Sequence, residues 1–116
     1  MANSAEKVVV EALKTITGLK IFPDVAPSGT TGPYVTYQAV GGQDVNGLDG
    51  PADLENQRMQ ITVWSATRAA TGDTMRGARS ALVAAGGIPI GAAVSQYEAD
   101  TKLYGSRLDF SVWFRP

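Results

Sequence analysis

The 116-residue sequence contains no cysteine and no histidine. Without cysteine, the chain cannot form disulfides, use a thiol nucleophile or build the usual structural zinc sites. Without histidine, it lacks the commonest general base and the commonest transition-metal ligand. These two absences exclude most catalytic mechanisms, so we expect a protein that is not an enzyme and that uses no cofactor.

Charged residues and long hydrophobic runs are also scarce. Charged residues make up 18% of the chain, the net charge is −1, and the lysines and arginines are scattered. Specific nucleic-acid binding is therefore not expected, because it usually needs a gathered basic surface. No apolar run approaches the ~20 residues that span a bilayer, and the N-terminus lacks a signal-peptide pattern. We therefore expect no membrane contact and synthesis in a cytoplasm-like compartment.

The length and the hydrophobic content indicate one globular domain. Hydrophobic residues make up 44% of the 116 residues. A chain of this size buries enough apolar surface to fold without disulfides or metals. We therefore treat residues 1–116 as a single domain.

Two stretches with a 3.6-residue hydrophobic period predict helices over residues 5–17 and 66–85. Ser4 and Thr67 are suitable N-caps, and glycines follow both stretches. The residues expected on the inward faces are Ala5, Val8, Val9, Ala12, Leu13 and Ile16 in the first helix, and Thr71, Met75, Ala78, Leu82 and Ala85 in the second.

Two glycines fall inside the second predicted helix. Gly72 and Gly77 each cost about 1 kcal/mol relative to alanine in a helix interior. Their presence predicts either a later helix start, near Thr71, or close packing of this helix against a sheet.

The remaining ordered segments predict strands rich in β-branched and aromatic residues. A short extended piece at Ile21-Phe22 ends in a turn, and Pro89 makes residues 88–93 irregular or a short edge piece. The fold class expected is α+β: an antiparallel sheet of about four strands with two helices packed on one face, in the order α-β-β-α-β-β. The four strands are expected at residues 34–40, 57–65, 94–98 and 103–114.

Two tryptophans break the period-2 pattern of the two longest strands. Each strand alternates apolar and polar residues, but Trp64 and Trp113 fall on the polar side. Arg58, Arg107 and Asp109 also lie on that side, where these charged residues can form cross-strand pairs. Two explanations stay open: a loop, such as residues 41–56, covers one end of the polar face, or the tryptophans contact another subunit or protein.

The connection over residues 41–56 is long, glycine-rich and acidic. Loops of this length in small domains often carry function. Its acidic and amide residues invite comparison with a calcium loop, but Leu48 occupies a ligand position and Gly50 comes one residue late. We therefore interpret it as a solvated loop without a metal, and its candidate contact residues are Asp44, Asn46, Leu48 and Asp49.

The order of these segments is similar to that of a known family. The segments that carry the resemblance are Ile21–Pro27, Pro33–Gln38, Leu48–Gly50, Arg58–Thr67 and Leu108–Phe114. In this order they resemble the tail completion, or tail terminator, family of long-tailed bacteriophages and prophages, to which the phage lambda tail terminator is structurally similar. The resemblance extends over nearly the whole chain, from the first helix to Phe114.

The resemblance implies a structural role in the virion. Family members are small α+β subunits that form a ring, typically hexameric, at the head-proximal end of the tail tube. The ring ends tube polymerisation and offers a surface for the head, and the family has no catalytic residues. The implied partners are further copies of this chain, the tail-tube protein and head–tail connector proteins, first in the host cytoplasm and then in the virion.

The contacts with these partners are expected on the polar side of the sheet and on the long loop. Two other functions stay open: another neck or connector component, and a small-molecule or regulatory module with a split βαβ-like fold. The candidate interface residues are Trp64, Trp113, Arg58, Asp109, Asp44, Asn46, Leu48 and Asp49.

Overall fold

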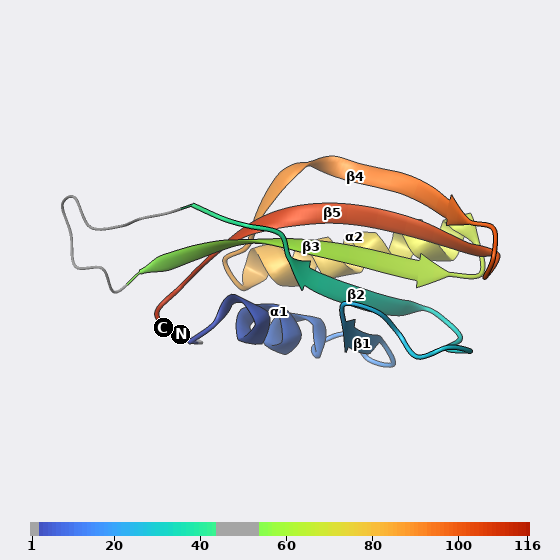
Figure 1. Ribbon diagram of the computed structural model, residues 1–116, viewed down its shortest axis with the longest axis horizontal. Coiled ribbons are helices and arrows are strands. Elements are labelled where there is room, and N and C mark those ends of the chain that lie inside the picture. The colour runs from blue at the N-terminus through green and yellow to red at the C-terminus, as the bar shows by residue number, and fades with distance from the viewer. Residues whose placement is uncertain (1–2, 44–53) are drawn as a thin grey trace.

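A five-stranded sheet with two helices forms the architecture of the protein (Figure 1). The computed structural model describes residues 3–43 and 54–116. The spatial order of the strands is β1-β2-β3-β5-β4. The elements are α1 (Ala5–Leu13), β1 (Lys20–Pro23), β2 (Tyr34–Ala39), β3 (Glu55–Ser65), α2 (Arg68–Ala84), β4 (Ile88–Glu98) and β5 (Leu103–Phe114).

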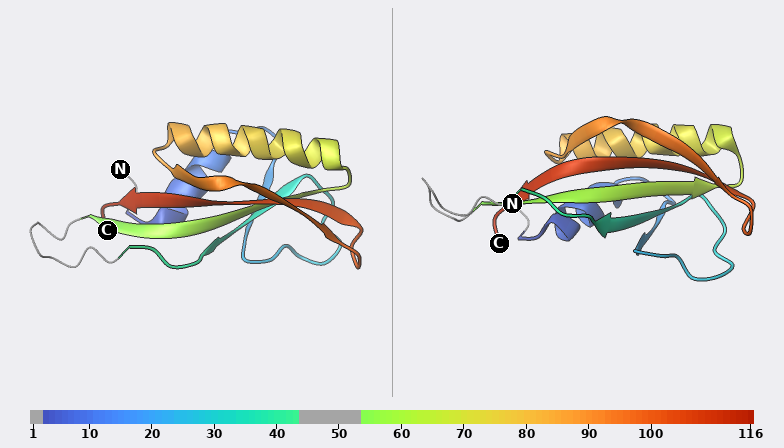
Figure 2. Two further views of the ribbon diagram at one scale, coloured as in Figure 1. Left: turned by 90° about the horizontal axis from the view of Figure 1, so that it is seen from above. Right: turned by 45° about the horizontal axis from the view of Figure 1, so that its top comes forward.

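Both helices pack on the same face of the sheet, as predicted. The alternate residues Met59, Ile61 and Val63 of β3 are fully buried, and their partners on β5 are buried with them. Figure 2 shows α2 lying along this face. One hydrophobic core therefore joins sheet and helices, and its buried members are Ala5, Val9, Ala12, Leu13, Val35, Met59, Ile61, Val63, Met75, Ala78, Leu82, Leu108, Phe110, Val112 and Phe114.

The sheet differs from the predicted one in its first strand. The piece around Ile21-Phe22 is not a lone extended segment but strand β1, which pairs in parallel with β2. The observed order is thus α-β-β-β-α-β-β, and the sheet is mixed with five strands, not antiparallel with about four. The prediction missed this strand because four residues are too few to show a period, and because parallel pairing needs a long return connection that sequence pattern does not reveal.

Helix α1 ends four residues earlier than predicted. The last α-helical residue is Leu13, and the chain then continues in tighter turns to Gly18, whose φ is 80°. The backbone N–H and the hydroxyl of Thr15 both donate to the carbonyl of Ala12. This three-residue spacing satisfies the final carbonyls and replaces the last α-turn of the prediction.

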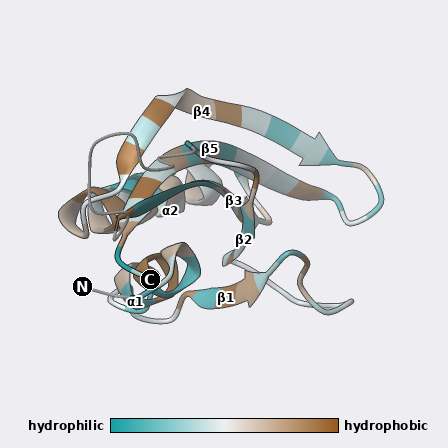
Figure 3. Cartoon of the chain, turned by 60° about the vertical axis from the view of Figure 1, so that its left-hand side comes forward, coloured by the Kyte–Doolittle hydropathy of each residue, from teal (hydrophilic) through white to brown (hydrophobic). Residues whose placement is uncertain are grey.

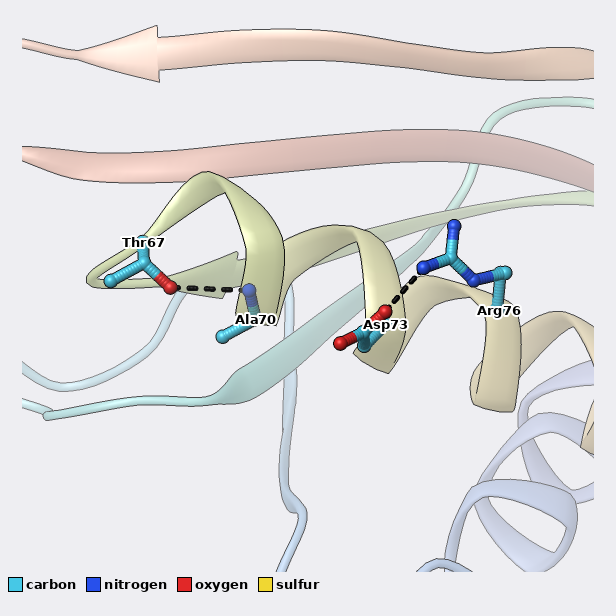
Figure 4. Close-up of polar contacts among 4 residues, drawn as sticks. All are labelled: Thr67, Ala70, Asp73 and Arg76. Atoms are coloured by element: carbon cyan, nitrogen blue, oxygen red, sulfur yellow. Dashed lines mark hydrogen bonds and ion pairs between the residues drawn. The ribbon is translucent and has the colours of Figure 1, made fainter.

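Helix α2 begins where its cap predicts. The hydroxyl of Thr67 accepts a hydrogen bond from the backbone N–H of Ala70, and Asp73 pairs with Arg76 one turn later (Figure 4). Neither explanation given for the two helix glycines is correct. The helix starts at Arg68, and side-chain atoms added at Gly72 or Gly77 would meet no part of the sheet.

Strand β4 is longer and less regular than predicted. It is continuous from Ile88, but its pairing with β5 shifts between Ile90 and Val94. Gly91 has a φ of 77° at this shift, a conformation that glycine adopts without a steric penalty. The bulge explains why residues 88–93 lack a clear strand pattern, since the alternation is interrupted in the middle of the strand.

Candidate assembly surface

The face of the sheet that lies away from both helices carries the polar residues of the central strands. We call it the open face. Strand register brings Arg58 opposite Ser111 and Gln60 opposite Asp109 on this face. Both tryptophans lie here as well, as their positions in the alternation predict. Its central residues are Thr36, Gln38, Asn56, Arg58, Gln60, Thr62, Trp64, Gly105, Arg107, Asp109, Ser111 and Trp113.

The two tryptophans occupy opposite ends of the open face. Trp64 is paired with Gly105, whereas Trp113 is paired with Asn56, at the other end of β3. With a rise of about 3.3 Å per residue, the two pairs lie roughly 26 Å apart. The tryptophans therefore form two separate features and not one aromatic cluster.

The ring of Trp64 lies over Gly105. A Cβ at Gly105 would lie 2.9 Å from Cζ3 of Trp64 and 2.8 Å from Cγ of Gln96. Any larger residue at this position would have to displace one of these side chains. The glycine thus allows the indole to lie against the backbone of β5, and this partly explains why a large apolar ring is accommodated on a polar face.

A loop covers the Trp64 end of the open face. The loop is residues 24–33, between β1 and β2, and Figure 2 shows it on the side of the sheet opposite α2. A Cβ at Gly32 would lie 2.9 Å from the carbonyl oxygen of Trp64, so the loop closely approaches the end of β3. Of the two explanations left open by the sequence, a covering loop applies at the Trp64 end, where loop 24–33 lies; most of the 41–56 connection lies outside the described residues.

A groove of about 680 Å³ lies between this loop and the sheet. Trp64 and Gln96 line it together with the buried threonines Thr36 and Thr62. Its lining mixes hydroxyl and amide side chains with apolar and charged ones, such as Leu103 and Glu98.

Burial and nearby carboxylates raise the pKa of two tyrosines. Burial is the main cause for Tyr34, and the negative charge of Glu98 adds to it. Burial is again the main cause for Tyr37, with smaller contributions from Glu6 and Asp24. Both phenols therefore stay neutral beyond their ordinary titration range.

An ordered polar ladder crosses the middle of the open face. Nε of Arg58 donates to Oδ2 of Asp109 over 2.7 Å, which confirms the predicted cross-strand pair. The Arg58 side chain is 47% exposed and that of Asp109 15% exposed. Nδ2 of Asn56 donates to Oγ of Ser111 over 2.8 Å. The ladder fixes the register of β3 on β5 and leaves an arginine available to a partner.

A row of exposed aliphatic side chains runs along β4 beside the Trp113 end. Ile88 is 54% exposed, Ile90 37% and Val94 49%. We call these three residues the apolar row. Ile88 is paired with Ser111, two residues from Trp113, so the half-buried indole continues the row onto β5. Figure 3 shows the hydrophobic segments of β4 at the outer edge of the sheet.

Sequence reasoning missed the apolar row. The signal was present, because residues 88–97 carry no charge and edge strands are normally protected by charged side chains. Pro89 and Gly91 obscured this signal, because proline and glycine usually interrupt a strand. The other candidate contact residues, Asp44, Asn46, Leu48 and Asp49, lie outside the described residues.

Neither a metal-binding cluster nor a membrane-spanning helix is found among the residues that the structure describes. Within residues 3–43 and 54–116, no three acidic side chains come close enough to hold a metal ion. Among the helices of these residues, none is both long and apolar enough to cross a membrane.

Comparison with known protein families gives one match over almost the whole chain. Residues 8–115 match the sequence model of the family described as Tail completion protein gp17. A comparison with curated proteins found no significant match. The family match begins within α1 and extends past the end of β5, and it therefore covers all five strands and α2.

Comparison with solved structures finds the same fold in a chain of a gene transfer agent particle and in a bacteriophage protein. A chain in the virion of a native gene transfer agent particle is similar with a TM-score of 0.56 and 17% identity, over 93% of this chain and 92% of that one. The gp17 protein of bacteriophage SPP1 is similar with a TM-score of 0.53 and 20% identity, over 93% and 88% of the two chains. At these identities the likeness concerns the fold.

Proposed function

The chain belongs to the tail completion protein gp17 family of phage structural proteins, and from this we propose that it forms a ring at the head-proximal end of the tail tube. The ring ends polymerisation of the tube and presents the surface to which the filled head joins. Its partners are further copies of the chain, the tail-tube protein and head–tail connector proteins. Assembly takes place in the host cytoplasm, and the product remains in the virion.

The observation that carries this proposal is the uncharged, exposed edge of the sheet. Residues 88–97 of β4 contain no charged side chain, and three of them form the apolar row. An exposed edge without charged side chains favours aggregation in a protein that stays alone. In an assembly component, the same edge is buried once the neighbouring subunit or partner is in place.

The open face supplies the second contact in this proposal. Trp113 and the exposed guanidinium of Arg58 face away from the helices, and both residue types are frequent at the centre of protein interfaces. Trp64 and Asp109 support this surface from within, the first against Gly105 and the second by its pair with Arg58. The acidic residues of the 41–56 connection are proposed to meet the tube or to line the bore.

Electron microscopy of particles made without this protein tests the function. Infected cells or induced lysogens that lack the gene should accumulate overlong tails without heads. Expression of the intact chain from a plasmid should restore tails of normal length that carry heads. Tails of normal length without heads would instead indicate a neck component, and complete particles would overturn both assignments.

A further inference from the structure

We infer that neighbouring copies of this chain pair through their sheet edges, with residues 94–98 of one copy against β1 of the next. This inference rests on the proposed ring, because it names the surfaces through which the subunits meet. In the described part of the chain, β1 and β4 form the two edges of the sheet. A contact between two different edges is head-to-tail, which is the kind of interface that closes into rings.

The direction of the strands favours this pairing. β1 runs parallel to β2, and each further step across the sheet, to β3, β5 and β4, is antiparallel. β1 and β4 consequently run in opposite directions. When a second copy continues the sheet in the same orientation, its β1 lies antiparallel to β4, and antiparallel pairing is the slightly more stable arrangement.

The bulge in β4 divides its edge into two short segments. The pairing shift between Ile90 and Val94 leaves Val94–Glu98 as the longer regular segment. β1 spans four residues, Lys20–Pro23, and is one residue shorter than that segment. Pairing of two β4 strands along their whole length is disfavoured, since each copy would bring a bulge into the ladder.

The faces and charges select one register. If Lys20 lies opposite Glu98, Ile21 lies opposite Tyr97 and Phe22 opposite Gln96. Ile21 packs against the core and Tyr97 stacks on Tyr104, so these two share the helix-bearing face. Phe22 and Gln96 share the open face. Apolar side chains therefore meet on the helix-bearing side, and opposite charges meet at the end of the ladder.

Both charged side chains are exposed and keep capacity for a new partner. Nζ of Lys20 donates to the carbonyl of Thr31 over 3.1 Å, and an ammonium has two further donors. Oε1 of Glu98 accepts from the Thr101 hydroxyl over 2.8 Å, and a carboxylate has further acceptor sites. The pair can form between copies without breaking either existing hydrogen bond.

Disulfide trapping tests the pairing, because the chain has no cysteine of its own. Residues directly opposite in an antiparallel ladder have Cα atoms about 4.5–5.5 Å apart, which suits a disulfide. Under oxidation, the double variant Lys20→Cys with Glu98→Cys should give a ladder of covalent oligomers that ends at the closed ring. A mixture of the two single variants should give one cross-linked dimer and nothing larger.

The matched control moves one cysteine along the same strand. Lys20→Cys with Ala92→Cys keeps two exposed cysteines but places the second in the bulge, and it should cross-link at least tenfold less. Both pairs are to be tested in the purified protein and in particles from cells complemented with the variant. Absence of the Lys20–Glu98 cross-link in particles, or dimers formed by Glu98→Cys alone, would overturn the inference.

A charge exchange separates the interface from the function. Lys20→Glu should weaken self-association by about two- to fivefold, and Glu98→Lys in the same chain should restore it. Tail length without the protein is a separate measurement. If the cysteine variant forms cross-linked rings but cells that lack the protein still make tails of normal length, the interface is supported and the proposed function is rejected. Overlong tails in cells that lack the protein, together with no cross-link in the cysteine variant, would support the proposed function and reject this interface.

Discussion

Trp64 lies over Gly105, with the indole so close to the backbone of β5 that a Cβ on the glycine would lie 2.9 Å from Cζ3. The relationship explains how a tryptophan is held on a polar sheet face. Three further parts of the fold meet at this contact. Trp64 belongs to β3, Gln96 of β4 lies against the same glycine, and loop 24–33 approaches the backbone of Trp64. This arrangement gives the first prediction.

Gly105→Ala should lower the free energy of unfolding by about 1–3 kcal/mol, because the methyl group displaces the indole or Gln96. Urea unfolding measures the loss. In a Trp113→Phe background, the remaining tryptophan emission should shift to longer wavelength as the ring becomes more exposed. Gly77→Ala is the control, since nothing lies within 4 Å, and should stabilise the helix by up to about 1 kcal/mol. Unchanged stability and emission in Gly105→Ala would contradict the packing described.

The two tryptophans should respond differently to removal. Trp64→Ala leaves a cavity above Gly105 and removes part of the groove lining. We therefore expect the free energy of unfolding to fall by about 1–3 kcal/mol. Trp113→Ala should cost less stability but should reduce the joining of tails to heads. Thermal melting and counts of complete particles measure the two effects. If both variants only lower the melting temperature while assembly is unchanged, neither residue belongs to an interface.

The Arg58–Asp109 pair should couple weakly. The arginine is 47% exposed, so solvent screens the pair, and a double-mutant cycle with alanine should give a coupling of about 0.2–1 kcal/mol. Chemical unfolding of the four proteins provides the cycle. Raising the salt concentration to about 1 M should reduce the coupling further, because the Debye length falls to roughly 3 Å. A coupling above about 2 kcal/mol that salt leaves unchanged would show that the pair acts as a buried one.

Stability should fall at alkaline pH. The pKa of Tyr34 and of Tyr37 is raised in the folded state, so the folded protein holds these protons more tightly than the unfolded chain. The stability that the two tyrosines contribute is fully present below the ordinary tyrosine pKa of about 10. It is lost as the pH rises through their higher pKa values in the folded state. Melting temperatures measured across that range should show the decline. Tyr34→Phe with Tyr37→Phe should flatten it, whereas an equal slope in that variant would assign the loss to other groups.

Much of the fold follows from local pattern, and the errors have identifiable physical causes. The helix caps Ser4 and Thr67 and the period-2 strands are local signals, and the structure places both helices and the long strands accordingly. Strand β1 was missed because parallel pairing depends on a distant partner. The loop that lies near Trp64 was not identified, since sequence does not show which loop returns over which face.

The site was predicted less well than the fold. The alternation placed Trp64, Trp113, Arg58 and Asp109 on one face correctly, yet it could not show that the tryptophans lie at opposite ends. The apolar row on β4 went unnoticed because an edge strand is defined by its neighbours and not by its own sequence. Only the missing charge in residues 88–97 carried a hint.

The apolar row gives the last prediction. Ile88→Lys introduces a charge at a side chain that is 54% exposed, so the isolated subunit should keep its stability within about 0.5 kcal/mol. Assembly should fail, because burying an unpaired ammonium at an interface costs far more free energy than burial of the aliphatic row contributes. Val83→Lys on α2 is the matched control: it is 44% exposed, lies on another element and should leave both stability and assembly unchanged. Urea unfolding and electron microscopy of complemented particles compare the two. If both lysines are tolerated, the exposed edge of β4 remains exposed in the particle, and its lack of charge needs another reason.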